Sequence, residues 1–262
     1  MTAALALDGV THEFDGLRAV DGVDLTLQTG ARHGLIGPNG AGKSTLFNIV
    51  TGSLSPTGGT VHLGERDVTR VPQHRRAQLG IAQTFQHSSL FLNLTCTENV
   101  LLALHRVAGR SHRPVSRDRS AGVPAAEEAL ASAGLGERRD TLAGALSHGE
   151  RRQLELCLAF ACRPSVLLLD EPAAGLSPAE TDRLGDLLDQ MSPEVTLLVI
   201  EHDLDFVFRI ARDVTVLHLG SVLASGPAAE IRASDEVQRI YLGLQAGERL
   251  FLDEGDDGPA RG

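Results

Sequence analysis

Residues 37–45 read GPNGAGKST, and their types and spacing suit the binding of a phosphate chain. The glycines let backbone N–H groups close around phosphate oxygens. Lys43 has the compact ammonium that reaches the outer phosphates, and the Ser44 hydroxyl can bind Mg²⁺. Lys43 is also the single lysine among the 24 basic residues. The pattern predicts a nucleotide site; the alternative is a glycine turn that only precedes a helix.

A pair of carboxylates supplies the chemistry that a phosphate-binding loop lacks. Asp170 and Glu171 end the apolar run SVLLLDEP at 165–172, which is typical of a buried parallel strand. Phosphoryl transfer depends on metal placement and an oriented nucleophile, so we expect Asp170 to hold Mg²⁺ and Glu171 to polarise the attacking water. A further apolar run, VTLLVIEHD at 195–203, brings His202 to the same edge.

The elements of an α/β fold must position these groups. Residues 32–52 predict a short apolar strand, a glycine turn and an apolar-periodic helix, which is the context that the phosphate pattern requires. Strand patterns near 4–14 and 23–36, and in GTVHLG, predict a mixed β region beside this core.

Residues from about 87 to 160 interrupt the α/β pattern. They carry helix-like apolar spacing, as in TENVLLALHRVAG, without strand alternation. We therefore expect a P-loop NTPase core with an N-terminal β subdomain over 1–86 and 161–225, and an inserted α-helical lobe over 87–160. A closing helical segment and a disordered acidic tail are expected over 226–262.

Composition and charge exclude several classes of protein. The 262-residue chain is long enough for one large α/β domain with an inserted lobe. A net charge of -10, no tryptophan and 3% aromatic residues argue against a nucleic-acid partner, which needs a basic surface and stacking rings. The sequence shows no signal peptide and no apolar run of the roughly 18 residues that a membrane helix needs. We expect a cytoplasmic protein that meets the membrane through a partner.

Other conspicuous residues add no second site. The basic stretch 105–120 has no aromatic residues between its arginines and is interpreted as a solvated loop, with contact to lipid headgroups or a partner as the alternative. Cys96, Cys157 and Cys162 form no C-x-x-C pair, so we expect packing residues in a reducing compartment. No H-E-x-x-H spacing occurs.

The stretch LSHGE at 146–150 points to a family. It precedes an apolar helical pattern, and a serine beside a glycine at a helix start suits an anion. Together with the phosphate pattern, LLLDEP and IEHD in this order, it resembles the nucleotide-binding subunit of ABC transporters over about residues 5–245. The resemblance implies that two subunits sandwich two ATP molecules, and that Ser147 and Gly149 cap the γ-phosphate held by the other subunit.

The stretch 146–150, here called the signature loop, departs from the usual L-S-G-G-Q of this family. His148 stands at a glycine position and Glu150 at the position of glutamine. Ser147 and Gly149 keep the hydroxyl and the close approach of the backbone, so we expect phosphate capping to survive.

Further motifs of the family match single residues. Gln86, in AQTFQHSSLF, matches the glutamine that lies near Mg²⁺ and senses the membrane partner. Phe14 matches the aromatic residue that stacks on adenine, with a core phenylalanine as the alternative. His202 matches the histidine that contacts the γ-phosphate. The stretch AAGLSPAE at 173–180 matches the D-loop between subunits, with Ser177 where many relatives carry Asp.

The expected site therefore has three groups of residues. The expected catalytic residues are Glu171, His202 and Gln86. The expected Mg²⁺ ligands are Ser44, Gln86 and Asp170. The expected ATP-binding residues are Phe14, Gly37, Pro38, Asn39, Gly40, Ala41, Gly42, Lys43, Ser44, Thr45, Ser147 and Gly149.

A finer resemblance favours one branch of the family. Four stretches look like the ATP-binding subunits of branched-chain amino acid importers: TFQHSSLFLNLTCTENVLLA, EPAAGLSPAE, IEHDLDFVF and YLG. This implies a second ATP-binding subunit, identical or different, two transmembrane permeases at the inner face of the membrane and, indirectly, an extracytoplasmic substrate-binding protein. The alternatives are a urea or short-chain amide importer ATPase, a lipid-export ATPase and a soluble ABC protein outside transport.

Overall fold

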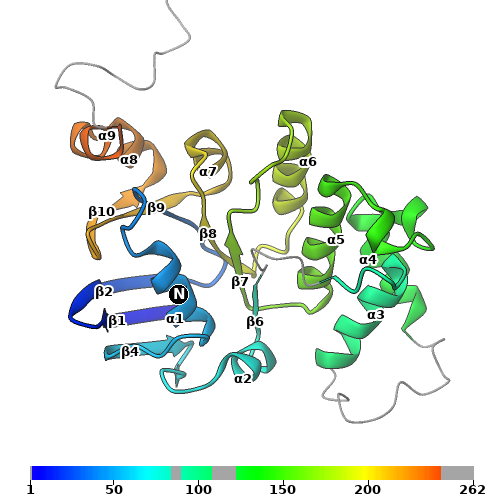
Figure 1. The fold of residues 1–262 in the computed structure, drawn as a ribbon, viewed down its shortest axis with the longest axis horizontal. Coiled ribbons are helices and arrows are strands. Elements are labelled where there is room, and N and C mark those ends of the chain that lie inside the picture. The colour runs from blue at the N-terminus through cyan, green and yellow to red at the C-terminus, as the bar shows by residue number, and fades with distance from the viewer. Residues whose placement is uncertain (1, 84–89, 108–121, 243–262) are drawn as a thin grey trace, which may run out of the picture.

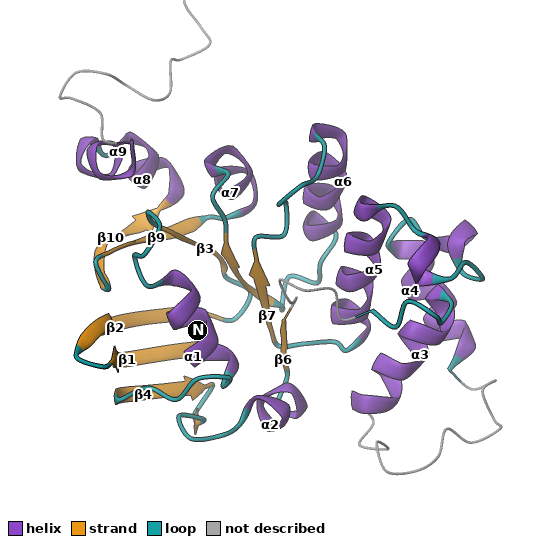
Figure 2. Ribbon diagram, viewed as in Figure 1, coloured by secondary structure: helices purple, strands orange, loops and turns teal. Residues whose placement is uncertain are grey.

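The computed structural model describes residues 2–83, 90–107 and 122–242, which form two sheets surrounded by helices (Figure 1). An antiparallel sheet has the strand order β2-β1-β4-β5, and a larger, mostly parallel sheet has the order β10-β9-β3-β8-β7-β6 (Figure 2). The strands of the first sheet are β1 Ala3–Phe14, β2 Leu17–Gln28, β4 Gly58–Leu63 and β5 Arg66–Asp67. Those of the second are β3 Arg32–Ile36, β6 Ile81–Gln83, β7 Val166–Asp170, β8 Thr196–Ile200, β9 Asp213–His218 and β10 Ser221–Pro227.

The helices fall into three groups along the chain. The first group comprises α1 Lys43–Thr51 and α2 Gln73–Gln78. The lobe contains α3 Cys96–Val107, α4 Val123–Ser132, the short 3₁₀ helices η2 Gly136–Arg138 and η3 Ala143–Ala145, and α5 His148–Ala161. The rest of the described chain adds α6 Pro178–Asp189, α7 Leu204–Ile210, α8 Ala228–Ala233 and α9 Asp235–Leu242. No helix in the described ranges has both the length and the apolarity to cross a membrane.

The parallel strands bring the predicted chemistry to one edge. Strand β3 pairs in parallel with β8 and β9, and β8 pairs in parallel with β7. Every residue of β7 and β8 is buried, as expected for strands covered on both faces. Because parallel strands end at the same edge, the loops that follow β3, β7 and β8 lie together.

The predicted strand region 23–36 is divided between the two sheets. Strand β2 ends at Gln28 and β3 begins at Arg32. Gly30 lies between them with a φ of 78°, and a Cβ there would overlap the carbonyl oxygen of Pro193. The turn that separates the sheets therefore depends on a glycine and on a contact with a distant loop.

The helical lobe has its own apolar core. Helices α3, α4 and α5 contribute most of it, and Cys96 and Cys157 are buried within it. The burial of these two side chains confirms that they are packing residues, and none of the three cysteines forms a disulfide in the described part of the chain. Helix α5 continues to Ala161, one residue beyond the predicted lobe boundary.

The C-terminal part of the described chain ends in two helices. Strand β10 extends to Pro227, slightly past the expected boundary, and α8 and α9 follow it. Most of the basic stretch, over 108–121, and the acidic tail, over 243–262, lie outside the described residues.

Candidate functional site

The phosphate-binding loop, residues 37–42, joins β3 to α1. Gly42 is the N-cap of α1 with a φ of 100°, and no side chain caps this helix. A Cβ at Gly42 would overlap the carbonyl oxygen of Ala19, and one at Gly37 would overlap that of Leu217. The loop therefore packs against neighbouring backbone at a distance that only glycine permits. The uncapped N–H groups of α1 are donors that suit an anion.

A turn from the other end of the domain supports this loop. Gly220, between β9 and β10, donates its N–H to the carbonyl of Ala41 at 3.1 Å, and its carbonyl accepts from the N–H of Asp21 at 2.9 Å. The phosphate-binding loop is therefore held by residues almost 180 positions away in the chain.

Lys43 is buried at the start of α1, with 6% of the residue exposed. Its Nζ donates to the carbonyls of Gly37 at 2.5 Å and Pro38 at 3.1 Å. Burial lowers the pKa of Lys43, while the nearby carboxylates of Glu171 and Asp170 act in the opposite direction. The lysine of the loop thus shares one electrostatic environment with Asp170, at the end of β7, and with Glu171, which follows it. Ser44 follows in the first helical turn and is exposed.

Asp170 ends β7 and is almost completely buried. Its Oδ1 has no hydrogen-bond partner among the described residues. Burial, reinforced by Glu171, raises the pKa of Asp170 to about 6. A buried carboxylate oxygen without a partner fits a metal ligand. The described ranges contain no group of three or more His, Cys, Asp and Glu side chains that could hold an ion, and Mg²⁺ commonly needs only one or two carboxylates beside phosphate oxygens.

Glu171 and His202 meet at the same edge. The Oε1 of Glu171 lies 2.5 Å from the Nε2 of His202. Glu171 has a φ of 47°, in the left-handed region that is unfavourable for a residue with a side chain. Its N–H donates to the carbonyl of Ile200 at 2.8 Å. The carboxylate and the imidazole can therefore share a proton and orient a water molecule.

Sequence reasoning missed the role of Glu201, which lies next to His202. Its carboxylate is buried and accepts N–H bonds from Ala173 at 2.6 Å and from His202 at 2.9 Å. Burial raises the pKa of Glu201. This side chain joins the end of β8 to the loop after β7. Its position before His202 is the one sequence signal that could have indicated it.

Arg152 of α5 was also missed. Its guanidinium donates to the backbone carbonyls of Asp170, Glu171 and Pro172. Because these partners are main-chain atoms, they cannot be predicted from a pattern of residue types. The contact links the helical lobe to the end of β7.

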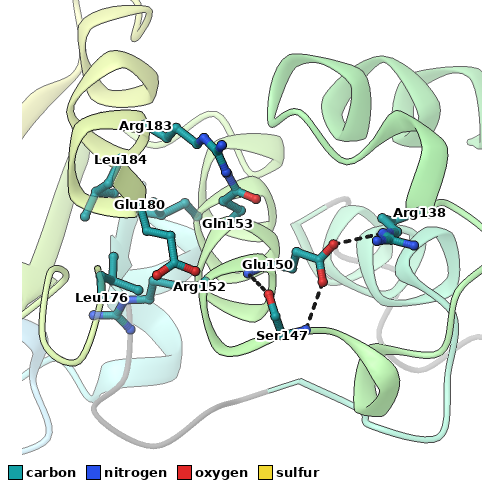
Figure 3. Close-up of a pocket in the computed structure, with 11 residues that line it drawn as sticks. Arg138, Ser147, Glu150, Arg152, Gln153, Leu176, Glu180, Arg183 and Leu184 are labelled. Atoms are coloured by element: carbon teal, nitrogen blue, oxygen red, sulfur yellow. Dashed lines mark hydrogen bonds and ion pairs between the residues drawn. The ribbon is translucent and has the colours of Figure 1, made fainter. Parts of the chain in front are cut away.

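Ser147 begins α5 with a complete capping box. Its Oγ accepts from the N–H of Glu150 at 3.2 Å, and the Glu150 carboxylate accepts from the N–H of Ser147 at 2.8 Å. Arg138 donates to the same carboxylate at 2.8 Å (Figure 3). The Ser147 hydroxyl accepts in this arrangement, so its own hydrogen can be donated to a phosphate oxygen.

The rest of the signature loop packs against the D-loop. A Cβ at Gly149 would overlap the carboxylate of Glu180. His148 lies close by, with its Nε2 3.5 Å from the carbonyl of Ala174. Ser147, Gly149 and Glu180 line a pocket of about 300 Å³ between α5 and α6. Figure 1 shows this pocket's helices well separated from α1, so Ser147 and Gly149 do not join Lys43 within one chain.

Phe14 and Gln86 are two further residues of the predicted site. Phe14 ends β1 and is 47% exposed, with its ring centroid 4.4 Å from that of His12. This exposure does not fit the alternative of a core phenylalanine, and the stacking of Phe14 on adenine stays a prediction. Gln86 lies outside the described residues.

Comparison with known sequences gives a consistent result. The family model described as "ABC transporter" matches residues 20–174. The high-affinity branched-chain amino acid transport ATP-binding protein BraF of Pseudomonas aeruginosa is 40% identical over 248 residues, covering 91% of this chain and 97% of BraF. The protein LivG, described in the same words, is 40% identical in Salmonella typhimurium and 38% identical in Escherichia coli K12, with the same coverage.

Solved structures agree with this. A nucleotide-free ATP-binding cassette from an ABC transporter superposes with a TM-score of 0.80 at 28% identity, covering 93% of this chain and 100% of that one. The ADP conformation of an ATP-binding cassette gives a TM-score of 0.82 at the same identity and coverage. The predicted α/β P-loop NTPase fold is confirmed. The chain belongs to the ABC transporter family and is one of its ATP-binding ATPases.

Proposed function

We propose that this chain is the ATP-hydrolysing subunit of an importer for branched-chain amino acids. The hydrolytic role rests on one observation: Glu171 and His202 are paired at the edge where Asp170 presents an unpartnered buried oxygen. The substrate class rests on relatives such as BraF, which are similar to this chain over nearly their whole length.

Ser44 and Asp170 would hold Mg²⁺, together with Gln86 from the part of the chain that is not described. The metal would supply positive charge against the phosphate oxygens. The fit is supported by the Oδ1 of Asp170, which has no other partner among the described residues.

The chain's own residues would then carry out the remaining steps. Lys43 and the N–H groups at the start of α1 bind the phosphates, and Phe14 stacks on the adenine. Glu171 accepts a proton from the attacking water, and His202 orients the Glu171 carboxylate and contacts the γ-phosphate.

A second ATP-binding subunit would complete each site. Ser147 and Gly149 lie away from Lys43 in one chain, yet they combine a hydroxyl donor with the N-terminus of a long helix. We infer that they contact the γ-phosphate held by the other subunit, which is either identical or different. Two permeases would hold this pair at the cytoplasmic face of the membrane, beneath an external substrate-binding protein.

The replacement Glu171→Gln tests the hydrolytic assignment. We expect turnover to fall by about 10²–10⁴-fold, because the base is lost while the shape is kept. Binding of a fluorescent ATP analogue should stay within about twofold, since the phosphate contacts remain. The exposed Glu194, replaced in the same way, is the matched control and should leave both quantities unchanged. Normal hydrolysis by Glu171→Gln would remove the assignment.

A separate experiment tests transport. The tagged chain is purified from gently solubilised native membranes, and its partners are identified by mass spectrometry. Two polytopic permeases and a second ATPase are expected, and uptake of labelled leucine should exceed that of urea or short amides. Recovery with soluble factors alone, or preference for urea, would contradict the proposed import of branched-chain amino acids.

A further inference from the structure

Arg152 occupies an unusual position between the helical lobe and the end of β7. It belongs to the second turn of α5, and its side chain is 12% exposed. Its Nη2 donates to the carbonyls of Asp170 at 3.2 Å and Glu171 at 3.1 Å, and its Nε donates to the carbonyl of Pro172 at 3.0 Å. One guanidinium thus holds three consecutive peptide units.

These peptide units form a strained turn. Glu171 has a φ of 47°, and such a conformation persists only where the surroundings hold it. On one side, the N–H of Glu171 is bonded to the carbonyl of Ile200. Arg152 supplies the bonds on the other side. The carboxylate that contacts His202 belongs to the residue with this backbone conformation.

The guanidinium itself is held in place by its own helix. Its Nη1 donates to the carboxylate of Glu155 at 2.8 Å, and that side chain is 8% exposed. Because the guanidinium is planar and one of its edges is bonded to Glu155, its other N–H groups point in a defined direction. A lysine ammonium could not reproduce that geometry. Arg152 also acts on Asp170 through its charge, which lowers the pKa of that carboxyl against the larger effect of burial.

Helix α5 connects this contact to the signature loop. Ser147 caps the helix, and Arg152 follows five residues later on the same rigid element. A shift of the N-terminus of α5 therefore moves the guanidinium relative to β7. Small displacements of a catalytic group can cost about 100-fold in rate.

We propose that Arg152 is a positioning residue for ATP hydrolysis, which couples the position of the signature helix to the orientation of Glu171. The inference rests on the proposed role of Glu171 as the base. It adds that the lobe controls the hydrolytic geometry within its own chain, in addition to any contact that it makes across a dimer.

A second arginine provides a matched control. Arg76 is fully buried and donates to four backbone carbonyls, at Ile49, Val50, Val71 and Thr69. Ile49 and Val50 lie in the last turn of α1, at the end opposite Lys43, and Thr69 and Val71 lie in the segment before α2. Replacing Arg76 should therefore weaken folding without changing the turnover of the molecules that remain folded.

The test measures ATP affinity, KM and kcat for Arg152→Gln, Arg152→Lys and Arg76→Gln, each normalised to the folded fraction. We expect Arg152→Gln to lose about 100-fold in kcat, with KM within about threefold because the phosphate contacts remain. The kcat of Arg152→Lys should lie between those of the wild type and Arg152→Gln, since an ammonium reaches some of the carbonyls. A wild-type kcat for Arg152→Gln, or for Arg152→Lys if the glutamine variant does not fold, would overturn the proposal.

A double variant separates this inference from the proposed function. If Arg152 acts through Glu171, adding Arg152→Gln to Glu171→Gln should lower kcat by no more than about twofold, because independent effects would multiply. Multiplied losses would overturn the coupling. Normal turnover in Glu171→Gln alone would instead overturn the base assignment, whereas a slow Glu171→Gln with a normal Arg152→Gln would remove only the role of Arg152.

Discussion

Two helices of this protein begin where a phosphate is expected, and they begin differently. Helix α1 follows Gly42, with no side-chain cap and no acidic residue in its first turn. Helix α5 follows Ser147, whose capping box with Glu150 is complete. The N–H donors at the start of α1 are thus left for a ligand, whereas part of those at the start of α5 is satisfied by the chain itself.

The charged side chains at the two helix starts also differ. Lys43 adds a cation to the start of α1, and Glu150 adds an anion to the start of α5, where Arg138 is paired with it. The difference supports the proposal that the start of α1 binds nucleotide without help from α5. The cap of α5 is complete within the chain. In the proposed dimer, this helix start would add only a hydroxyl and backbone contacts to a phosphate held by the other subunit.

The largest effect should come from Lys43→Ala. We expect ATP affinity of the isolated chain to fall by about 100-fold, because a charge-assisted contact with the phosphates is lost. The comparison variant Ser147→Ala should keep that affinity and lose about 1 kcal/mol of unfolding free energy, the usual cost of an N-cap. Titration with a fluorescent ATP analogue and urea unfolding measure the two quantities. Equal losses of affinity in both variants would break the distinction between the two helix starts.

A smaller effect should distinguish two glycines of the phosphate-binding loop. Gly42→Ala places a Cβ against the carbonyl of Ala19, while a Cβ at Gly40 meets nothing within 4 Å. Both residues have positive φ. We expect Gly42→Ala to lose about 1–3 kcal/mol more unfolding free energy than Gly40→Ala, because the overlap adds to a shared backbone strain. Urea unfolding without nucleotide provides the measurement, and equal stability of the two variants would contradict the close packing.

The smallest effect concerns acid and the cap of α5. The N–H of Ser147, with further help from Arg138, lowers the pKa of Glu150 from its usual 4.5. A carboxyl with a lowered folded-state pKa stabilises the protein above its unfolded pKa, and this stabilisation is lost as pH falls through the folded value. The free energy of unfolding of the wild type should therefore exceed that of Glu150→Gln by less than about 1 kcal/mol at pH 7. This difference should vanish as the pH is lowered. A difference independent of pH would contradict this origin.

Much of the site was predictable because its groups follow strands or lie in fixed patterns. Lys43 is defined by its glycine spacing, and Asp170 and Glu171 by the apolar run before them. Parallel pairing then brings His202 to the same edge. The predicted roles and domain boundaries remain predictions.

The parts of the fold and site that were not predicted depend on contacts that cannot be recognised from residue patterns. Arg152 and Arg76 bond to main-chain carbonyls, which every residue possesses. The break at Gly30 depends on a carbonyl from a loop more than 160 residues later. Helical or strand periodicity reports which face is buried, and it cannot report which distant backbone lies against that face.

The support of the phosphate-binding loop by Gly220 has a consequence for biosynthesis. The loop is made among the first 45 residues, yet the groups that back it, at Leu217 and Gly220, are made near the end of the chain. A growing chain on the ribosome therefore carries the loop sequence long before it can hold the loop's shape. A truncated product that stops before Gly220 would lack this support, so we expect it to bind nucleotide more weakly than the full chain.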